Sequence, residues 1–417
     1  MSIETSKKSN INNISGSRDI KNFWVASLSE SVVDFGIYSS RTYLPNYIVA
    51  VGGNDKVIGQ INSLGYFIWA LSQPLGGYLS DKRGRRFALL YFTGVLALAY
   101  LAYSIAPTWH FIVVAVLLEN ISKMYIPALQ ALLAESLSKR ERTRGFLIID
   151  MLSNALSIPA PYIGGLIISK VGGVTGMRYV FLMSVIAITS AFIARLLLLR
   201  ETYVPKDKNN GSMHMHFSIH ETIGALRKGI ITLRGMGKAL LVILLIESIT
   251  FSMPMGILGP YTIRYATIKG LNEERWGEIV SIARLAYFIT TIGVIPFLSR
   301  ISTFHCLLIG SVISSISMVL FPKGYFLISL SMLLIGQAIY GAAIFSLLSL
   351  MATSTIRGRI MGIFDMISML FGAFGSFISS FIYPHNPSLN FLIAAFLFFV
   401  GFICLLLSFK LISKYLS

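Results

Sequence analysis

Charged side chains are scarce in this chain of 417 residues. Asp, Glu, Lys and Arg make up only 13% of it, whereas 55% of the residues are hydrophobic. Soluble globular domains carry roughly twice that share of charge. The scarcity excludes an ordinary soluble domain and predicts an all-α polytopic membrane protein.

Acidic residues and cysteines are especially few. The chain has 18 Asp and Glu against 35 Lys and Arg, which gives a formal net charge of +17. The basic residues lie in short connections between apolar runs and build no broad basic face, so we expect no nucleic-acid partner. The two cysteines, Cys306 and Cys404, both lie inside apolar runs, which argues against a disulfide framework.

The sequence also lacks the patterns of nucleotide, metal and catalytic sites. It contains no Gly-Lys-Ser/Thr phosphate loop, so nothing indicates ATP as an energy source, and we expect no cofactor. No nucleophile–base pair and no set of metal ligands recurs at one depth, so we expect neither an enzyme nor a metal site. The histidines His214, His216 and His220 stand without cysteine or carboxylate support, and we interpret them as a polar surface cluster.

Long apolar runs dominate what is present. A helix needs about 20 apolar residues to cross a bilayer core of about 30 Å. Runs of about this length occur at residues 23–48, 57–79, 87–106, 109–134, 146–169, 179–199, 239–263, 276–298, 304–321, 325–352, 360–383 and 389–409. These runs predict twelve transmembrane helices.

Positive charge indicates how these helices are oriented. With the N-terminus inside, most Lys and Arg residues of the connections fall on the inner side. Cytoplasmic loops are the basic ones in membrane proteins. We therefore expect a multi-pass protein of the plasma membrane with both termini in the cytoplasm.

A long polar connection divides the chain into two units. We expect a cytoplasmic tail at residues 1–22, a six-helix unit at 23–200, a cytoplasmic linker at 201–237, and a second six-helix unit with a short tail at 238–417. Within the linker, Ser218 and Glu221 form a capping-box pattern, after which basic and apolar residues interleave. This pattern predicts an amphipathic helix on the inner leaflet.

A short internal repeat supports the two-part design. An arginine, an Asp-Met pair six residues later and a serine recur with the same spacing, as Arg144, Asp150, Met151 and Ser153 and as Arg359, Asp365, Met366 and Ser368. The two copies open the fifth and the eleventh spans, which occupy the same place in each half. We interpret the repeat as a duplication. Asp150 and Asp365 lie only about 9 Å inside their spans, and we expect them to help close a cytoplasmic gate.

Charges inside the apolar spans mark the candidate functional residues, because a charge at the bilayer centre is costly and usually faces a polar interior. In the first span, Glu30, Asp34 and Arg41 share one stripe of the helix. Asp34 has no opposite charge one turn away. We expect Asp34 to be the proton-coupling carboxylate, assisted by Glu30 or Glu119.

Further charges lie at similar depth in later spans. Glu119 and Lys123 are spaced i, i+4, which suits a helix ion pair, so they are either a buried structural pair or functional groups. Glu247 in the seventh span and Arg284 in the eighth are the other two. We expect Arg41, Lys123, Glu247 and Arg284 to line a substrate cavity.

The loop from Gly77 to Arg86 is the strongest motif. Gly77 would let a neighbouring helix approach closely, and Gly84 permits a left-handed backbone. The loop resembles the signature loop between the second and third helices of the major facilitator superfamily, at Gly77, Leu79, Asp81, Lys82, Gly84, Arg85 and Arg86.

Other segments extend this resemblance. The stretch from Pro127 to Glu135, followed by Arg142 and Arg144, resembles the family's connection between spans four and five. The segment with Pro161, Gly164 and Gly165 is similar to the antiporter signature of drug-efflux branches, although Ala160 replaces a glycine of that signature. The arginine that efflux members often carry in span four is also absent here, with Ala115 in its place.

The resemblance implies two pseudo-symmetric six-helix bundles that rock about a central site lined by the first, fourth, seventh and tenth helices. It adds Gln337 and Tyr340, on the tenth helix, to the expected cavity. It implies that Asp81 holds the cytoplasmic ends shut against Arg357 and Arg359. The expected gate comprises Gly77, Asp81, Lys82, Gly84, Arg85, Arg86, Glu135, Arg144, Asp150, Arg357, Arg359 and Asp365, with Pro161, Gly164 and Gly165 packing helices together.

These observations predict a secondary active transporter that works by alternating access, as a monomer, on a small organic solute. Proton-coupled efflux of a drug or metabolite is the favoured reading, because of the partial antiporter signature and the acidic stripe. One alternative is a proton symporter that takes up a sugar or an organic anion, with Lys123 or Arg284 holding the carboxylate. Another is a membrane sensor that transports nothing and uses the amphipathic linker as its output.

Overall fold

Helices make up almost all of the structure, a computed structural model that describes residues 20–138, 141–202, 238–294, 301–351 and 357–409. No strand occurs among these residues. The helices of the N-terminal half are α2 (Ile20–Arg41), α3 (Leu44–Ala50), α4 (Asp55–Arg83), α5 (Arg85–Ile105), α6 (Trp109–Ser122), α7 (Tyr125–Ser136), α8 (Arg142–Ser157), α9 (Ala160–Val171) and α10 (Gly173–Leu198). Those of the C-terminal half are α12 (Lys238–Glu247), α13 (Met253–Leu258), α14 (Thr262–Ile268), α15 (Glu273–Ile289), α17 (Thr303–Leu320), α18 (Phe326–Met351), α19 (Arg357–Ile382) and α20 (Pro387–Leu407), with short helical turns η1 (Ser248–Ser252), η2 (Thr290–Val294) and η3 (Phe321–Lys323).

Nine helical segments of the described chain are long and apolar enough to cross a membrane. The segments that fall short of this measure among the expected spans are those of α2, α4 and α15. The sequences of α2 and α4 are diluted by serine, asparagine and charged residues, and α15 is only 17 residues long. The structure thus supports a polytopic helical protein, and the number of twelve spans stays a prediction.

Several expected spans are interrupted rather than continuous. The first breaks at Tyr43, just before Pro45, and the fifth breaks around Pro159, two residues before Pro161. Proline removes a backbone donor and crowds the preceding turn, which explains both breaks. The seventh span contains a π-helical turn, η1, directly after Glu247. Such turns are rare and often mark functional positions.

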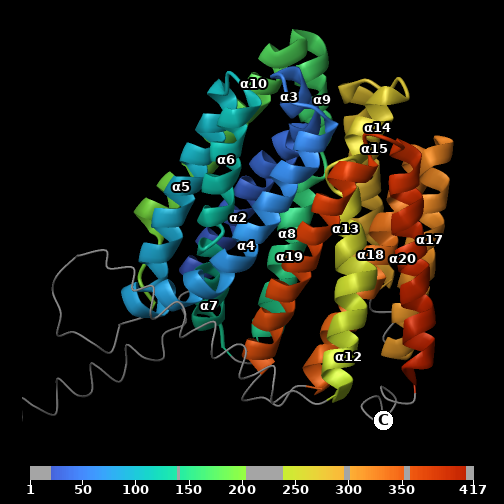
Figure 1. The fold of residues 1–417 in the computed structure, drawn as a ribbon. Coiled ribbons are helices and arrows are strands. Elements are labelled where there is room, and N and C mark those ends of the chain that lie inside the picture. Colours follow the sequence, from blue (N-terminus) through green and yellow to red (C-terminus); the bar gives the residue numbers. More distant parts are fainter. Residues whose placement is uncertain (1–19, 139–140, 203–237, 295–300, 352–356, 410–417) are drawn as a thin grey trace, which may run out of the picture.

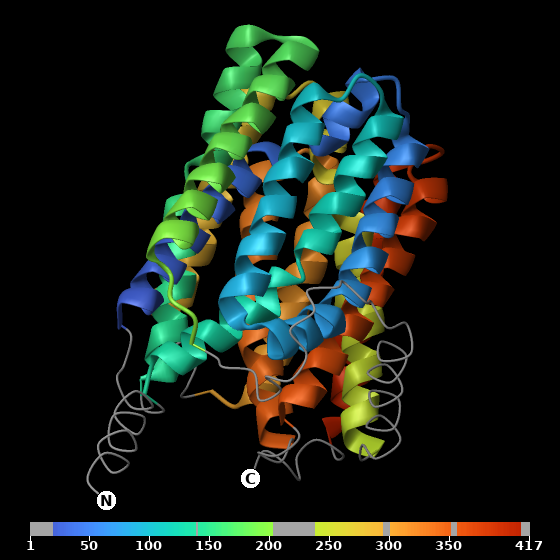
Figure 2. The same cartoon turned by 90° about the vertical axis from the view of Figure 1, so that its left-hand side faces the viewer.

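The two halves of the chain lie side by side (Figure 1), and Figure 2 shows the N-terminal half in front of the C-terminal half. We call the helix ends around the turn that joins α4 to α5 the Gly84 end, and the opposite ends the Asp55 end. Helices α4 and α19 lie close together toward the Asp55 end and diverge toward the Gly84 end. The hydrogen bonds and ion pairs that join described residues of the two halves lie from mid-height to the Asp55 end.

The apolar core follows the same division. One cluster of buried side chains runs through the N-terminal half and continues into the parts of the C-terminal half near the Asp55 end, such as Tyr261, Trp276 and Tyr383. A second cluster, with Leu244 and Leu347 among its members, stays within the C-terminal half. Both cysteines are free, with Cys306 buried and Cys404 half-buried. The expected N-terminal tail and the amphipathic linker helix lie outside the described residues.

The close helix approach expected at Gly77 occurs instead at Gly76. A Cβ atom added to Gly76 would overlap the Met124 backbone, with its Cα only 2.7 Å away, whereas one added to Gly77 would meet Pro127 at 4.0 Å. The expectation for Gly77 was wrong because neighbouring residues on a helix point about 100° apart. Gly76 faces the break between α6 and α7, and Gly77 does not.

We expect Gly76→Ala to lower stability by about 1 to 3 kcal/mol, because the methyl group forces α4 away from Met124. Gly77→Ala is the matched control and should be neutral or slightly stabilising, since alanine favours helices by up to about 1 kcal/mol over glycine. Thermal unfolding of both variants in detergent tests this. Equal losses in the two variants would contradict the assignment of the contact to Gly76.

Candidate functional site

A polar face of α2 forms the backbone of the candidate site. Its residues Glu30, Asp34, Tyr38 and Arg41 follow one another at about one-turn intervals from the middle of the helix toward the Asp55 end. They meet side chains from α5, α6, α7, α8, α10 and α15. The stripe read from the sequence therefore faces the interior of the protein.

The Glu30 carboxylate binds an arginine that was not singled out from the sequence. Arg195 on α10 is completely buried, and its guanidinium donates to Glu30 at 2.5 Å, to Ser29 at 2.8 Å and to Thr93 at 2.7 Å. The Tyr125 hydroxyl donates to the other Glu30 oxygen at 2.7 Å. Because each group is satisfied, this network acts first as a structural link between α2, α5, α7 and α10.

Asp34 is different because no ion pair binds it directly within the described residues. Its partly exposed carboxylate accepts a hydrogen bond from Ser153 on α8 and interacts with Glu30 on its own helix. Arg195 and Arg284 act on it electrostatically from other helices. Both cations come from helices distant in sequence, so the absence of an opposite charge one turn away on α2 did not reveal them.

Glu119 pairs with Arg41 and not with Lys123. The Arg41 guanidinium donates to Glu119 at 2.5 Å, and Tyr103 donates to the same oxygen at 2.6 Å. Glu119 is only 2% exposed. The i, i+4 pair does not form because α6 ends at Ser122, so Lys123 no longer follows the helix that carries Glu119.

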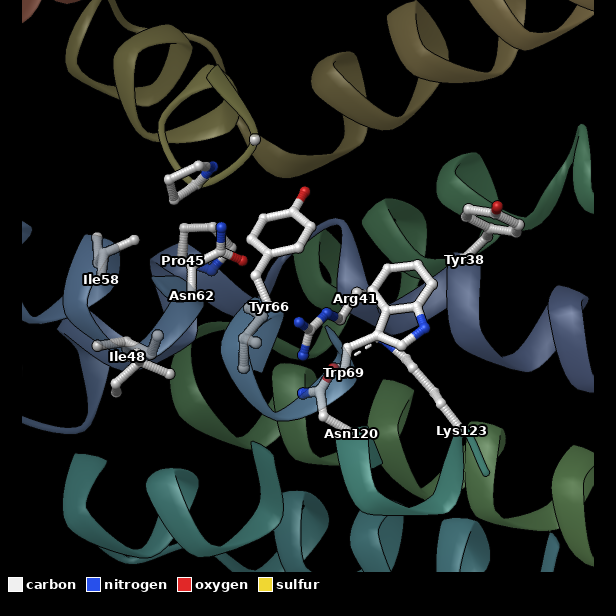
Figure 3. A pocket seen from close by; sticks show the side chains of 14 residues that line it. Tyr38, Arg41, Pro45, Ile48, Ile58, Asn62, Tyr66, Trp69, Asn120 and Lys123 are labelled. Carbon is white, nitrogen blue, oxygen red and sulfur yellow. Dashed lines mark hydrogen bonds between the residues drawn. The ribbon is translucent and has the colours of Figure 1, made fainter. Parts of the chain in front are cut away.

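Lys123 enters a cavity of about 320 Å³ (Figure 3). Its ammonium donates to Asn120 at 2.8 Å and lies 3.8 Å from the centre of the Trp69 ring. No carboxylate forms an ion pair with it among the described residues. Figure 3 shows Arg41 between Tyr66 and Trp69 in the same cavity. The wall is completed by Tyr38, Leu44, Pro45, Ile48, Ile58, Ile61, Asn62, Gly259 and Pro260.

Arg284 approaches this cavity from the C-terminal half. Its guanidinium carbon lies 3.4 Å from the centre of the Tyr38 ring, a cation–π contact between α15 and α2. Since Tyr38 lines the cavity and Asp34 lies one turn away, Arg284 connects the two. Arg41 and Lys123 thus line the cavity, and Arg284 lies beside it against Tyr38.

The other expected cavity residues lie elsewhere in the C-terminal half. Glu247 is 4% exposed and accepts hydrogen bonds from Ser252 at 2.6 Å and Ser368 at 2.9 Å. Gln337 donates to the Met255 sulfur at 2.7 Å, and Tyr340 stacks on Phe251 at 3.9 Å between ring centres. None of the three lines the cavity around Lys123.

The motif loop forms a compact polar cluster within the N-terminal half. Arg85 binds Asp81 at 2.5 Å, Ser80 at 2.8 Å and Glu135 at 3.3 Å, while Arg86 donates to the carbonyls of α10. Gly84 has a φ of 106°, so the turn needs glycine. The remaining expected gate residues Lys82, Arg144, Asp150 and Asp365 are exposed or half-buried, and the side chains of Arg357 and Arg359 lie outside the description.

This polar cluster contains a residue that the motif did not indicate. The Glu201 carboxylate accepts from the backbone N–H groups of Arg85 at 2.9 Å and Arg86 at 3.0 Å. A carboxylate at a helix start satisfies free amides and the helix dipole. Glu201 therefore ties the end of α10 to the start of α5.

Close packing and polar contacts shut the Asp55 end. A Cβ on Gly165 would overlap the Glu273 carbonyl oxygen, and one on Gly164 would overlap the Ser39 carbonyl oxygen. Pro161 contributes its carbonyl oxygen to the Tyr43 hydroxyl. Asn46 donates to Thr267 at 2.9 Å, and Arg264 binds Asp55 at 2.7 Å across the two halves. Gly165 thus lets α9 pack directly on α15, and Gly164 lets it pack on α2.

We expect Asp55→Asn to weaken closure at this end. The pair with Arg264 is about one quarter exposed on each side, so its loss is worth about 1 kcal/mol, enough for a several-fold shift between closed and open populations. Spin-label distances between the halves at the Asp55 end measure that shift. Glu278→Gln, which removes an exposed pair within α15, should leave the distances unchanged, and an equal effect of both variants would contradict the prediction.

Arg195, Trp69 and Asn120 are among the residues of the site that sequence reasoning missed. Arg195 carried a clear signal, since it is a lone charge inside an apolar run. Trp69 and Asn120 gave none, because an aromatic and an amide in a helix are ordinary until the fold places them beside Lys123.

Comparison with known sequences places these features in context. A family model described as the Major Facilitator Superfamily matches residues 26–321. The Multidrug resistance protein MdtG of Enterobacter lignolyticus is 28% identical over 174 residues, which cover 40% of this chain and 40% of that protein. The protein of the same name from Salmonella paratyphi C is 25% identical over 341 residues, covering 76% of this chain and 78% of its own.

Solved structures share the fold at low identity. A peptide transporter POT in complex with sulfate superposes with a TM-score of 0.76 at 16% identity, covering 95% of this chain and 96% of that chain. The nucleoside transporter NupG gives 0.73 at 17% identity, with 93% and 100% covered. The human organic anion transporter MFSD10 gives 0.67 at 16% identity, also with 93% and 100% covered.

Proposed function

Because the chain belongs to the Major Facilitator Superfamily, we propose that it is a proton-coupled secondary transporter that moves a small organic solute across the plasma membrane by alternating access. The observation that carries this proposal is the polar face of α2. There, Asp34 lies one turn from Tyr38, which lines the cavity that holds Arg41 and Lys123. A carboxylate that can take up a proton and a solute cavity thus share one helix.

The arrangement of the halves supports alternating access. Contacts between them close the Asp55 end, and α4 and α19 diverge toward the Gly84 end. The basic connections indicate that the Gly84 end faces the cytoplasm. We assign the structure to the inward-facing state, in which Asp81 pairs with Arg85 of its own loop. The proposed contact of Asp81 with the start of α19 belongs to the outward-facing state.

The cavity favours a solute with an anionic group and an aromatic or apolar body. Lys123 supplies an ammonium without a carboxylate partner in the described chain, and Trp69, Tyr66 and Tyr38 supply aromatic surface. Of the acidic residues near it, Glu119 is already paired with Arg41. A cationic amphiphile would therefore meet like charge at this point.

Efflux is the direction we propose, supported by the relatives named as multidrug resistance proteins and by the segment around Pro161. Uptake of an organic anion together with protons is the second candidate, favoured by the cations Lys123 and Arg284 beside the cavity. The sensor alternative rests on the linker, which lies outside the described residues, and it predicts no solute flux at all.

Proteoliposomes with opposite pH gradients separate these functions. We would offer three probes with one aromatic body, namely naphthaleneacetate, naphthaleneacetamide and naphthylmethyl-trimethylammonium. Efflux by proton antiport predicts accumulation of the anion in an acidic lumen, whereas symport predicts accumulation in an alkaline lumen beyond that of protein-free liposomes. Accumulation of the cation alone would overturn the assigned solute charge.

A further inference from the structure

The two serines of the internal repeat each lie beside a carboxylate in the structure. They occupy equivalent places on α8 and α19, the helices that open with the repeat. The Ser153 hydroxyl interacts with the Asp34 carboxylate on α2, the first helix of the N-terminal half, and also lies 3.2 Å from the Ser31 hydroxyl on that helix. Ser368 donates to Glu247 at 2.9 Å on α12, the first helix of the C-terminal half. Each half thus places a repeat serine beside a carboxylate of its first helix.

We propose that Glu247 is a second proton-binding site, the counterpart of Asp34, so that each half of the protein carries one exchangeable proton. This inference rests on the proposed proton coupling and extends it. It also changes the role expected for Glu247, which does not line the cavity around Lys123.

The surroundings of Glu247 suit a group that exchanges a proton. The side chain is only 4% exposed, and the described residues offer it no ion pair. A buried carboxylate without a cation is costly in its charged form. Three serine hydroxyls compensate in part, from Ser252 at 2.6 Å, Ser368 at 2.9 Å and Ser248 at 3.5 Å. Hydroxyl groups can donate to the carboxylate and accept from the protonated acid, so they serve both forms.

The π-helical turn η1 builds this site. It spans Ser248–Ser252, and a π-helix aligns residues five apart, which brings Ser252 onto the carboxylate of Glu247. A regular α-helix would align Glu247 with Phe251 instead. The π-helical turn is a second, independent indication that Glu247 does more than pack helices together.

A buried tyrosine lies close to Glu247. Tyr340 on α18 is 1% exposed, its hydroxyl has no hydrogen-bond partner among the described residues, and it interacts electrostatically with Glu247. Asp365 on α19 is the other titratable group near Glu247. Helix α20 packs on the remaining side and carries Cys404 as its one titratable residue.

The two sites differ in their charged neighbours. Asp34 faces Glu30 on its own helix, Arg195 on α10 and Arg284 on α15, with Tyr100 and Tyr125 also close. Glu247 has Asp365 nearby and no arginine or lysine in the described surroundings. The two carboxylates also have different serine neighbours, Ser153 at Asp34 and Ser368 at Glu247, and substitution of each serine makes the two sites separable by experiment.

Infrared difference spectra of the purified full chain, recorded between about pH 4 and pH 9, test the proposal without any solute. A protonated carboxyl group absorbs as a carbonyl, and a buried one is resolved from those in water. We expect Glu247→Gln to remove one buried component and Asp34→Asn to remove another. Ser368→Ala should shift only the component lost in Glu247→Gln, and Ser153→Ala only the component lost in Asp34→Asn. Glu278→Gln, an exposed control, should change only the water-exposed signal.

A pH-jump measurement with a proton-sensitive dye adds a count. Glu247→Gln should take up one proton fewer per molecule than the parent protein. A Glu247→Gln spectrum identical to that of the parent overturns the inference, as does a Ser368→Ala spectrum without a shift. Ser368→Ala keeps the test valid if Glu247→Gln fails to fold.

The outcome is independent of the proposed function. If Glu247 titrates but the protein moves no solute, the transport proposal is wrong and the Glu247 proton site stands. If the protein transports solute but the spectra contain no Glu247 component, the Glu247 site is wrong and the transport proposal stands.

Discussion

We expect Asp34→Asn to abolish uphill transport and to leave solute exchange intact. The substitution keeps the size of the side chain and its place beside Ser153, but removes the carboxylate that we propose takes up the proton. Exchange of solute across the membrane needs no net proton movement, so it continues. Accumulation against a gradient requires the proton, so the ratio of inner to outer solute falls to that of passive equilibration.

Proteoliposomes report both processes from one preparation. Counterflow of labelled naphthaleneacetate measures exchange, and accumulation under a pH gradient measures coupling. Glu278→Gln, whose partner Arg275 is exposed on the surface of α15, serves as the control and should retain both. Asp34 would lose its assigned role if the variant still concentrated solute against a gradient.

We expect Arg195→Met to lower stability by about 3 to 5 kcal/mol, because it leaves the Glu30 carboxylate, which is only 12% exposed, without its cationic partner. Arg195 is completely buried and ties together Glu30, Ser29 and Thr93 from two other helices. Methionine fills much of the same volume, so the loss reports the missing charge and hydrogen bonds more than a cavity.

The double variant Glu30→Gln with Arg195→Met tests this explanation. It removes both charges, so much of the loss should be recovered, as for other buried pairs replaced by neutral groups. Arg275→Met is the matched control, because its pair with Glu278 is 72% and 43% exposed and such pairs contribute about 0 to 1 kcal/mol. Thermal unfolding in detergent ranks the variants. A double variant no more stable than Arg195→Met alone would contradict the account.

Local sequence was enough to predict most helices and the inward stripe of α2. Apolar runs and the cost of exposing backbone groups in a bilayer leave a helix as the solution, and charges such as Asp34 and Lys123 must avoid lipid. The positive φ of Gly84 was likewise predictable from the loop itself. These features depend on a residue and its near neighbours alone.

The partners of those charges could not be predicted in the same way. Glu119 had Lys123 one turn away, yet it pairs with Arg41, because α6 ends between the two. Glu30 binds Arg195, which lies 165 positions later in the chain. The close contact at Gly76 depends on where the break between α6 and α7 falls. Each of these outcomes depends on how helices pack against one another. The residue pattern of a single helix does not contain that information.

Uphill accumulation of naphthaleneacetate by proteoliposomes with an imposed pH gradient and no membrane potential tests the central claim most directly. The account predicts that the parent protein concentrates this anion in an acidic lumen, that an ionophore which collapses the gradient stops accumulation, and that Asp34→Asn shows none. A protein that moves none of the three naphthalene probes under either gradient, while remaining folded, would contradict it.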